Sequence, residues 1–162
     1  MVSNTNPSNR RRVTSSGFSL MELLIVIAII LTILSVILPN VHGINMGTKE
    51  MAVAKQIGTI HTAQAQYQAQ FGKFAVTLTE LGPSPNGESS ASAADLIPHE
   101  LANGKKNGFT FQLQGTAAGY TISAKPDVYK GTGRKTFYSD QTLLIRENWG
   151  PEPATAASPA MK

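Results

Sequence analysis

One uninterrupted apolar stretch near the N-terminus constrains this chain more than any other feature. Residues 18–38 read FSLMELLIVIAIILTILSVIL, and Glu22 is their only charged residue. As an α-helix this stretch is about 31 Å long at ~1.5 Å per residue, enough to cross a hydrocarbon layer of ~30 Å. Burial of its large apolar side chains is favourable by something on the order of tens of kcal/mol. We therefore expect it either in a membrane or buried against other copies of itself.

Three alternative roles for this stretch fit less well. A cleaved signal peptide has an apolar region of only about 7–15 residues followed by a small-x-small cleavage site, whereas here PNVHG follows at residues 39–43. A plain signal anchor leaves Glu22 without a role. A buried helix of a soluble domain would need a second segment apolar enough to cover it, and the sequence contains none.

Composition predicts one small domain without disulfides or metal. The chain has 162 residues, of which 41% are hydrophobic and only 15% charged, and this length suits about one domain. The absence of cysteine excludes disulfide frameworks, thiolate zinc sites and cysteine nucleophiles. The histidines lie far apart in the sequence, so we expect no His-rich metal site, and no cofactor is indicated. They are His42, His61 and His99.

The net charge of +4 belongs mainly to the N-terminal leader. Arg10, Arg11 and Arg12 form the only basic run longer than two residues, and without them basic and acidic residues nearly balance. A nucleic-acid-binding surface over the whole protein is therefore not expected. The positive-inside rule would keep these arginines on the cytoplasmic side and place the C-terminal portion outside.

Glu22 is the most informative single residue of the apolar stretch. A carboxylate inside an apolar helix is costly and usually has a partner. No Lys, Arg or His lies between Phe18 and Val41, so the same helix cannot supply a side-chain cation. A free α-amino group on a neighbouring chain could supply one after cleavage between Gly17 and Phe18, and Glu22 would then set the register between subunits. The alternative is that Glu22 merely extends to the water interface.

Residues 10–29, RRRVTSSGFSLMELLIVIAI, resemble the type III signal sequence of type IV pilins and type II secretion pseudopilins. The resemblance is strong over residues 10–40 and looser beyond. It implies cleavage after Gly17 by a prepilin peptidase, an inner-membrane aspartic protease that also methylates the new N-terminus at Phe18. It implies as well that Glu22 pairs with the amine of an adjacent subunit.

The resemblance and the sequence pattern together predict an α+β, pilin-like fold. A long N-terminal helix, membrane-spanning in its first half, would pack against a small antiparallel β-sheet of about four strands. We expect a cleaved basic leader at 1–17, a transmembrane and filament-core helix at 18–38, its amphipathic continuation at 39–71, a globular head at 72–149 and a disordered tail at 150–162.

Helix-weakening residues follow the apolar stretch. Pro39 removes a backbone donor, and Gly43 and Gly47 weaken the same region, so we expect a bend or local melting at 39–47. The resemblance suggests that such melting occurs inside a filament, whereas a harmless kink is the alternative. Apolar residues then recur at helical spacings and are expected to face the head. They are Ile44, Met51, Ile57, Ile60, Tyr67 and Phe71.

The head shows short-range signals for two helical turns and a sheet. Residues 77–81 have capping-box spacing, residues 82–94 are rich in Pro, Gly and Ser and predict an exposed loop, and residues 95–102 allow a short helix interrupted by a proline. Alternation of apolar and polar residues and turn residues between the segments predict the strands. Those strands are expected at 109–113, 120–124, 135–139 and 142–146.

The function implied by the resemblance is structural. The chain would be a subunit of a type IV pilus-like filament, polymerised from the inner membrane through bundling of its N-terminal helices, or, alternatively, a pseudopilin of a type II secretion system. The expected partners are further copies in a helical filament, the prepilin peptidase, an inner-membrane assembly platform and the bilayer before assembly. The expected location is the inner membrane, single pass with a periplasmic head, and then a cell-surface pilus or a periplasmic pseudopilus.

Other function classes have weaker support. For a membrane-anchored enzyme, His99 beside Glu100 is the nearest acid–base pair, and adjacent residues rarely converge on one substrate. An anchored monomeric binding module is the third possibility.

Some pseudopilins bind calcium, but Asp127 and Asp140 are few ligands for a hard cation. Many type IV pilins have a C-terminal disulfide that this chain lacks. Basic clusters could contact DNA, although a solvated basic surface is favoured. They contain Lys105, Lys106, Lys130, Arg134 and Lys135.

Overall fold

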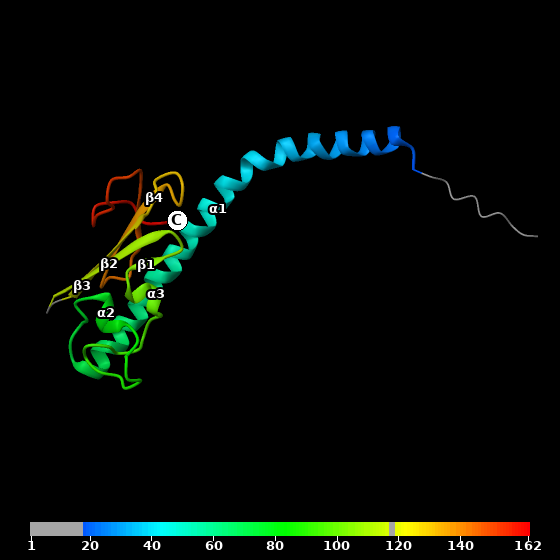
Figure 1. The fold of residues 1–162 in the computed structure, drawn as a ribbon. Coiled ribbons are helices and arrows are strands. Elements are labelled where there is room, and N and C mark those ends of the chain that lie inside the picture. The colour runs from blue at the N-terminus through cyan, green and yellow to red at the C-terminus, as the bar shows by residue number, and fades with distance from the viewer. Residues whose placement is uncertain (1–17, 117–118) are drawn as a thin grey trace, which may run out of the picture. The chain divides into compact units, whose positions relative to one another are not determined.

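The chain divides after Asn40 into two compact units. The computed structural model describes residues 18–116 and 119–162, apart from the side chains of residues 36–44. Helix α1, Leu20–Phe71, contributes to both units, and all other helices and strands belong to the second. Figure 1 shows the elements in order along the chain.

The first unit corrects the prediction of a transmembrane segment. Within the described part of the chain, no helix combines the length and the apolar character needed to cross a membrane. The prediction of a membrane-spanning helix at 18–38 is therefore wrong. The predicted location, a single-pass inner-membrane protein with a periplasmic head, is wrong with it.

The second unit is an α+β head with an antiparallel meander of five strands. The strands lie side by side in sequence order, and each pairs with the next in antiparallel register. The α+β class and the antiparallel sheet are thus confirmed, whereas the expected number of about four strands is too small. The strands are β1 Lys105–Lys106, β2 Phe109–Thr116, β3 Gly119–Pro126, β4 Lys135–Asp140 and β5 Arg146–Trp149.

The last strand lies later in the chain than predicted. Residues 142–145 form a turn and a loop, because the Asp140 carboxylate accepts hydrogen bonds from the backbone N–H and the hydroxyl of Thr142 at 2.9 and 2.6 Å. Leu143 then takes a left-handed conformation, with φ of 65°. An aspartate that bonds two residues ahead competes with strand geometry. Strand β5 therefore begins only at Arg146.

The core lies between the second part of α1 and one face of the sheet, as Figure 1 shows. Of the predicted helical stripe, Ile57, Ile60 and Tyr67 are fully buried. Met51 is 70% exposed, because Val53, two residues along the helix, takes the buried position, and two residues turn a helix by about 200°. The sheet covers the stripe with its own apolar face. That face holds Phe109, Phe111, Leu113, Ile122, Ala124 and Phe137.

Helix α1 and strand β4 are matched in length along the core. Glu50 of α1 contacts Arg134 just before β4, and His61 of α1 contacts Ser139 near the end of β4. The helical segment between the first pair and the second rises by about 16 Å, as does the corresponding segment of strand. Polar contacts can therefore form at both ends of β4 without distortion of either element.

Local signals placed the first short helix correctly, whereas the second, expected over residues 95–102, covers only its last four residues. Helix α2, Leu78–Leu81, begins after Thr77, whose hydroxyl accepts a hydrogen bond from the Glu80 backbone N–H. Helix α3, His99–Ala102, follows Pro98. Helix α1 ends at Gly72, whose φ of 70° suits a residue without a side chain. The loop at 82–94 is tied at its base by hydrogen bonds from the backbone of Ala94, Asp95 and Leu96 to that of Glu80, Gly82 and Leu81.

The C-terminal tail is packed on the head, although a disordered segment was expected at 150–162. Its residues 159–161 run along β5, where Glu147 N–H donates to Pro159 O and Met161 N–H donates to Ile145 O, both at 2.9 Å. The hydroxyl of the buried Thr136 donates to the Glu152 carbonyl at 2.6 Å. A tail without apolar periodicity is thus held by hydrogen bonds to backbone groups and to the Thr136 side chain, which composition does not reveal.

Candidate functional site

The first part of α1 carries an apolar surface that the described residues do not cover. Consecutive residues of a helix point about 100° apart, yet Ile25, Val26 and Ile27 are 50%, 42% and 49% exposed. The helix is therefore apolar on all sides, unlike a helix that packs one stripe on a single core. We call this segment, residues 18–34, the apolar helix. Its exposed members are Phe18, Leu20, Met21, Leu23, Leu24, Ile25, Val26, Ile27, Ile29, Ile30, Leu31, Ile33 and Leu34.

Glu22 lies in the first turn of the apolar helix. Its backbone N–H donates to the carbonyl of Ser19 at 3.0 Å, and no cation of the described residues forms an ion pair with its carboxylate. Phe18 is 75% exposed and precedes the helix, while the predicted cleavage partner Gly17 lies outside the described residues. A carboxylate beside a helix N-terminus benefits from the positive end of the helix dipole, but that dipole does not neutralise it.

The polar groups within the apolar helix are satisfied locally. Thr32 donates its hydroxyl to the Ala28 carbonyl at 2.8 Å, and Ser35 donates to the Thr32 carbonyl at 2.8 Å. These side chains need no partner from elsewhere, because the helix backbone accepts their only donors. Glu22 is the only charged side chain described in this segment, and its carboxylate would need an outside partner once water is removed.

The predicted bend at 39–47 remains a prediction. The backbone of α1 is helical across Pro39, Gly43 and Gly47. A Cβ atom added to Gly47 would meet nothing within 4 Å, so close packing does not require a glycine there. The side chains around Pro39 and Gly43 are outside the described set, as is that of Ile44.

A buried polar network in the head was missed by the sequence reasoning. The His61 ring lies between the Tyr120 hydroxyl at Nδ1 and the Ser139 hydroxyl at Nε2, each at 2.8 Å. Ser139 donates its own proton to the Leu144 carbonyl at 3.0 Å. Nε2 of His61 must therefore be protonated and donate a hydrogen bond to the Ser139 oxygen, while Nδ1 accepts a hydrogen bond from the Tyr120 hydroxyl. This network uses a neutral imidazole.

A serine hydrogen-bonded to a histidine can form a nucleophilic catalytic site, provided that a substrate can reach the serine oxygen. This pair does not meet that second requirement. Ser139 is completely buried and its hydroxyl proton is directed to Leu144, so no substrate reaches the oxygen. The network instead joins α1 to β3 and β4. A signal for it was present in the sequence, because His61 lies four residues after Ile57 on the buried side of the helix.

The network predicts that the head loses stability in mild acid. Burial lowers the pKa of the His61 imidazole below its usual 6.5, and the Asp140 carboxylate opposes this shift. The unfolded chain therefore binds a proton before the folded chain does, and the free energy of unfolding falls as the pH drops below about 6.5, by at most ~1.4 kcal/mol per pH unit. Urea unfolding at pH 7.5 and 5.5 measures this loss.

Two histidine variants separate this effect from general acid sensitivity. His61→Gln should unfold with nearly the same midpoint at both pH values, whereas His99→Gln, at an exposed position, should keep the wild-type difference. Hydrogen bonds from Thr142 lower the pKa of the Asp140 carboxylate below its usual value, so this group stays ionised at both pH values. Equal pH dependence in the wild type and His61→Gln would contradict the assignment.

Two further polar contacts fasten the head to α1. The Gln64 side chain is fully buried and pairs with Ala75 at both ends of its amide, donating to the Ala75 carbonyl and accepting from the Ala75 N–H at 2.9 Å each. Glu50 is 4% exposed and accepts from the backbone N–H of Arg134 at 2.7 Å and from its guanidinium at 3.2 Å. Glu50 and Arg134 lie 84 residues apart, and Gln64 and Ala75 lie 11 apart, so neither contact follows from adjacent residues in the sequence.

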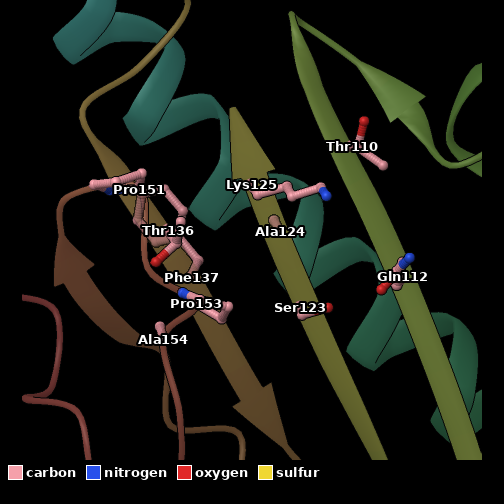
Figure 2. A pocket seen from close by; sticks show the side chains of 10 residues that line it. All are labelled: Thr110, Gln112, Ser123, Ala124, Lys125, Thr136, Phe137, Pro151, Pro153 and Ala154. Atoms are coloured by element: carbon pink, nitrogen blue, oxygen red, sulfur yellow. The ribbon is translucent and has the colours of Figure 1, made fainter. Parts of the chain in front are cut away.

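The outer face of the sheet holds a small cavity of about 150 Å³. Figure 2 shows Thr110, Gln112 and Lys125 on its sheet side and the tail prolines Pro151 and Pro153 on the other. Ligand pockets usually enclose about 300–1,000 Å³, so this cavity is small for an organic ligand. It marks the seam between the sheet and the tail.

The other candidate residues do not converge on one site. His99 contacts Asn103 at 3.0 Å, whereas Glu100 forms an ion pair with Lys106 at 3.7 Å. Asp127 accepts a hydrogen bond from Thr110 at 2.6 Å, whereas Asp140 bonds to Thr142. Among the residues that the structure describes, no three potential metal ligands lie together.

Comparison of the chain with protein-family models, with curated proteins and with solved structures finds no match. A functional assignment must therefore come from the residues of this chain. The apolar helix with its single carboxylate is the surface that most clearly needs a partner.

Proposed function

We propose that this chain is the structural subunit of a type IV pilus-like filament, held together by bundling of the apolar helices of many copies. The observation that carries the proposal is the apolar helix itself, which exposes large apolar side chains on every side around one carboxylate that pairs with no cation of the described residues. The resemblance of residues 10–29 to a prepilin signal sequence supports it.

All-round exposure favours many copies over a pair. A single partner helix covers one face of an apolar helix and leaves the others in water, whereas neighbours on several sides cover all of them. Burial of the half-exposed side chains is favourable by something on the order of 10 kcal/mol per subunit. A helical array of identical subunits surrounds each apolar helix with others and places the heads outside.

Glu22 supplies the register within that array. Cleavage after Gly17 frees the amine of Phe18, and Glu22 of an adjacent subunit neutralises it. Any other stagger between helices leaves both charges buried without a partner, which costs several kcal/mol. The apolar contacts therefore supply the affinity and the ion pair supplies the specificity.

A pseudopilin of a type II secretion system is the second candidate. The absence of cysteine favours it, because many type IV pilins close their C-terminal segment with a disulfide. In this chain the C-terminal segment is held by hydrogen bonds to Ile145, Glu147 and Thr136 instead. Electron microscopy of assembled subunits tests both candidates, since long filaments favour the pilin and short ones the pseudopilin.

Intact-mass analysis of the protein purified from cells that contain a prepilin peptidase tests processing. We expect loss of residues 1–17 and one methyl group on Phe18. A Gly17→Arg variant is the control and should keep its leader, because the peptidase requires a small residue before the cut. A wild-type protein that retains the three arginines and still forms filaments would contradict the proposed processing.

A further inference from the structure

The cavity on the outer face of the sheet has a polar floor. Gln112 of β2 lies opposite Ser123 of β3, and Thr110 lies opposite Lys125. Residues two apart on a strand project from the same face, so all four side chains project from the face opposite the core, and all four line the cavity. Figure 2 shows Lys125 extending from β3 toward β2. The register of two strands thus gathers four polar side chains at one place.

Three of these side chains have hydrogen-bond donors that the described residues leave free. Lys125 forms no ion pair, and neither Ser123 nor Gln112 forms a side-chain hydrogen bond with another described residue. Thr110 differs, because its hydroxyl donates to the Asp127 carboxylate at 2.6 Å. The floor therefore offers an ammonium, a hydroxyl and an amide as donors to a bound molecule.

The opposite wall of the cavity is apolar and belongs to the C-terminal tail. It consists of Pro151, Pro153 and the buried Ala154. Two hydrogen bonds fix this part of the tail on the sheet, since the Glu152 carbonyl accepts from the Thr136 hydroxyl at 2.6 Å and from the Asn148 amide at 3.0 Å. Proline has no backbone N–H, so this wall adds hydrocarbon surface and few donors.

Size and charge restrict what the cavity can hold. Its volume of about 150 Å³ is too small for a drug-sized molecule, but an engineered cavity of about this volume in another protein holds benzene, a molecule of about six non-hydrogen atoms. Of the described residues that line the cavity, Lys125 is the only charged one. Asp127, the acid nearest to it in the sequence, is hydrogen-bonded to Thr110 and forms no ion pair with Lys125. A small anion therefore fits both the volume and the charge.

We propose that this cavity binds a short aliphatic carboxylate of about six non-hydrogen atoms. The carboxylate oxygens accept hydrogen bonds from the Lys125 ammonium, the Ser123 hydroxyl and the Gln112 amide, and the bond from the ammonium is the strongest because both groups are charged. The hydrocarbon end lies against the two prolines of the tail. An inorganic anion such as phosphate fits less well, because it would place polar oxygens against this apolar wall.

A titration of the isotope-labelled full chain in nonionic detergent, followed by nuclear magnetic resonance at constant ionic strength, tests the site. The probe is butyrate. Butyramide has the same shape without the charge, and inorganic phosphate has the charge without the hydrocarbon. The variants are Lys125→Gln and Ser123→Ala, and the matched control is Lys55→Gln, which removes an exposed lysine of α1 outside the cavity. The amide spectrum of each variant also shows whether the head is folded.

Butyrate should shift the amide signals of Gln112, Ser123 and Lys125 in a saturable way, with a Kd on the order of 1 mM, which suits so small a ligand. Lys125→Gln should weaken binding about tenfold because the charge-assisted hydrogen bond is lost, and Ser123→Ala should weaken it severalfold. Lys55→Gln should bind butyrate as the wild type does. Butyramide and phosphate should each bind the wild type about tenfold more weakly than butyrate.

Three results would overturn the proposal. Signals that move in proportion to butyrate without saturation, or equal affinity in the wild type and Lys125→Gln, would show that the cavity is not a carboxylate site. Equal affinity for butyramide would show that the charge plays no part, and equal affinity for phosphate would show the same for the tail wall. This inference does not rest on the proposed filament function, and none of these results bears on assembly, so the two fail separately.

Discussion

Replacement of Glu22 by alanine is expected to raise the concentration needed for filament assembly by about 100-fold or more. In the proposed filament, the variant buries the amine of Phe18 without its counterion, and removal of one partner from a buried ion pair costs about 3–5 kcal/mol. Every 1.4 kcal/mol corresponds to a factor of ten in association. Sedimentation of polymer from monomer at a series of concentrations measures the change.

The controls for this prediction lie in the same helix. Glu22→Gln keeps the length of the side chain and removes its charge, and it should assemble as poorly as Glu22→Ala. Thr32→Ala removes a neutral polar group that is satisfied by the Ala28 carbonyl, so its assembly should match that of the wild type. Normal assembly of Glu22→Gln would show that the charge plays no part in the contact.

Replacement of Gln64 by alanine is expected to lower the free energy of unfolding of the head by about 3–4 kcal/mol. The fully buried amide satisfies both the N–H and the carbonyl of Ala75, and each buried backbone group left unpaired costs about 1–3 kcal/mol. Urea unfolding monitored by the fluorescence of Trp149, the only tryptophan, measures the loss.

Gln66→Ala is the matched control, because Gln66 is an exposed glutamine on the same helix. Its effect should stay within about 0.5 kcal/mol. Gln64→Glu adds a further distinction, since it can still accept from the Ala75 N–H but no longer donates to the Ala75 carbonyl when ionised. We expect it to be destabilising as well. An unchanged midpoint for Gln64→Ala would mean that Ala75 does not depend on this amide.

These predictions concern different contacts. Glu22 acts between copies and should leave the unfolding of the head unchanged, whereas Gln64 acts within the head and reduces assembly only by lowering the amount of folded subunit. The two variants therefore separate a failure of assembly from a failure of folding. The hydrogen bonds of His61 form a third, independent contact, and the predicted loss of head stability below pH 6.5 depends on them.

Features that depend on neighbours in sequence could be predicted well. Thr77 begins α2 because its hydroxyl caps the backbone three residues on, and Gly72 ends α1 because it adopts a positive φ easily. The strands around Phe111, Ile122 and Phe137 follow from alternation of apolar and polar residues. Each of these signals operates within a few residues, so no knowledge of the fold is needed.

Features that depend on distant partners could not be predicted. Glu50 and Arg134 lie 84 residues apart and His61 and Ser139 lie 78 apart, so their polar side chains read as surface positions until the fold brings them together. The path of the tail was missed because its partners, the backbone of Ile145 and Glu147 and the side chains of Thr136 and Arg146, are not adjacent to it in the sequence. The placement of the last strand failed because Asp140 bonds ahead to Thr142.

The sequence by itself determined that residues 18–34 are apolar on every side around one carboxylate, that a helix continues to about residue 71, and that an antiparallel sheet follows. Periodicity and local hydrogen bonding decide these properties. Only the tertiary structure decided which polar side chains of α1 are buried and where the tail packs. Those properties arise from pairs of residues far apart in the chain, and burial makes each unpaired polar group costly enough to select one arrangement.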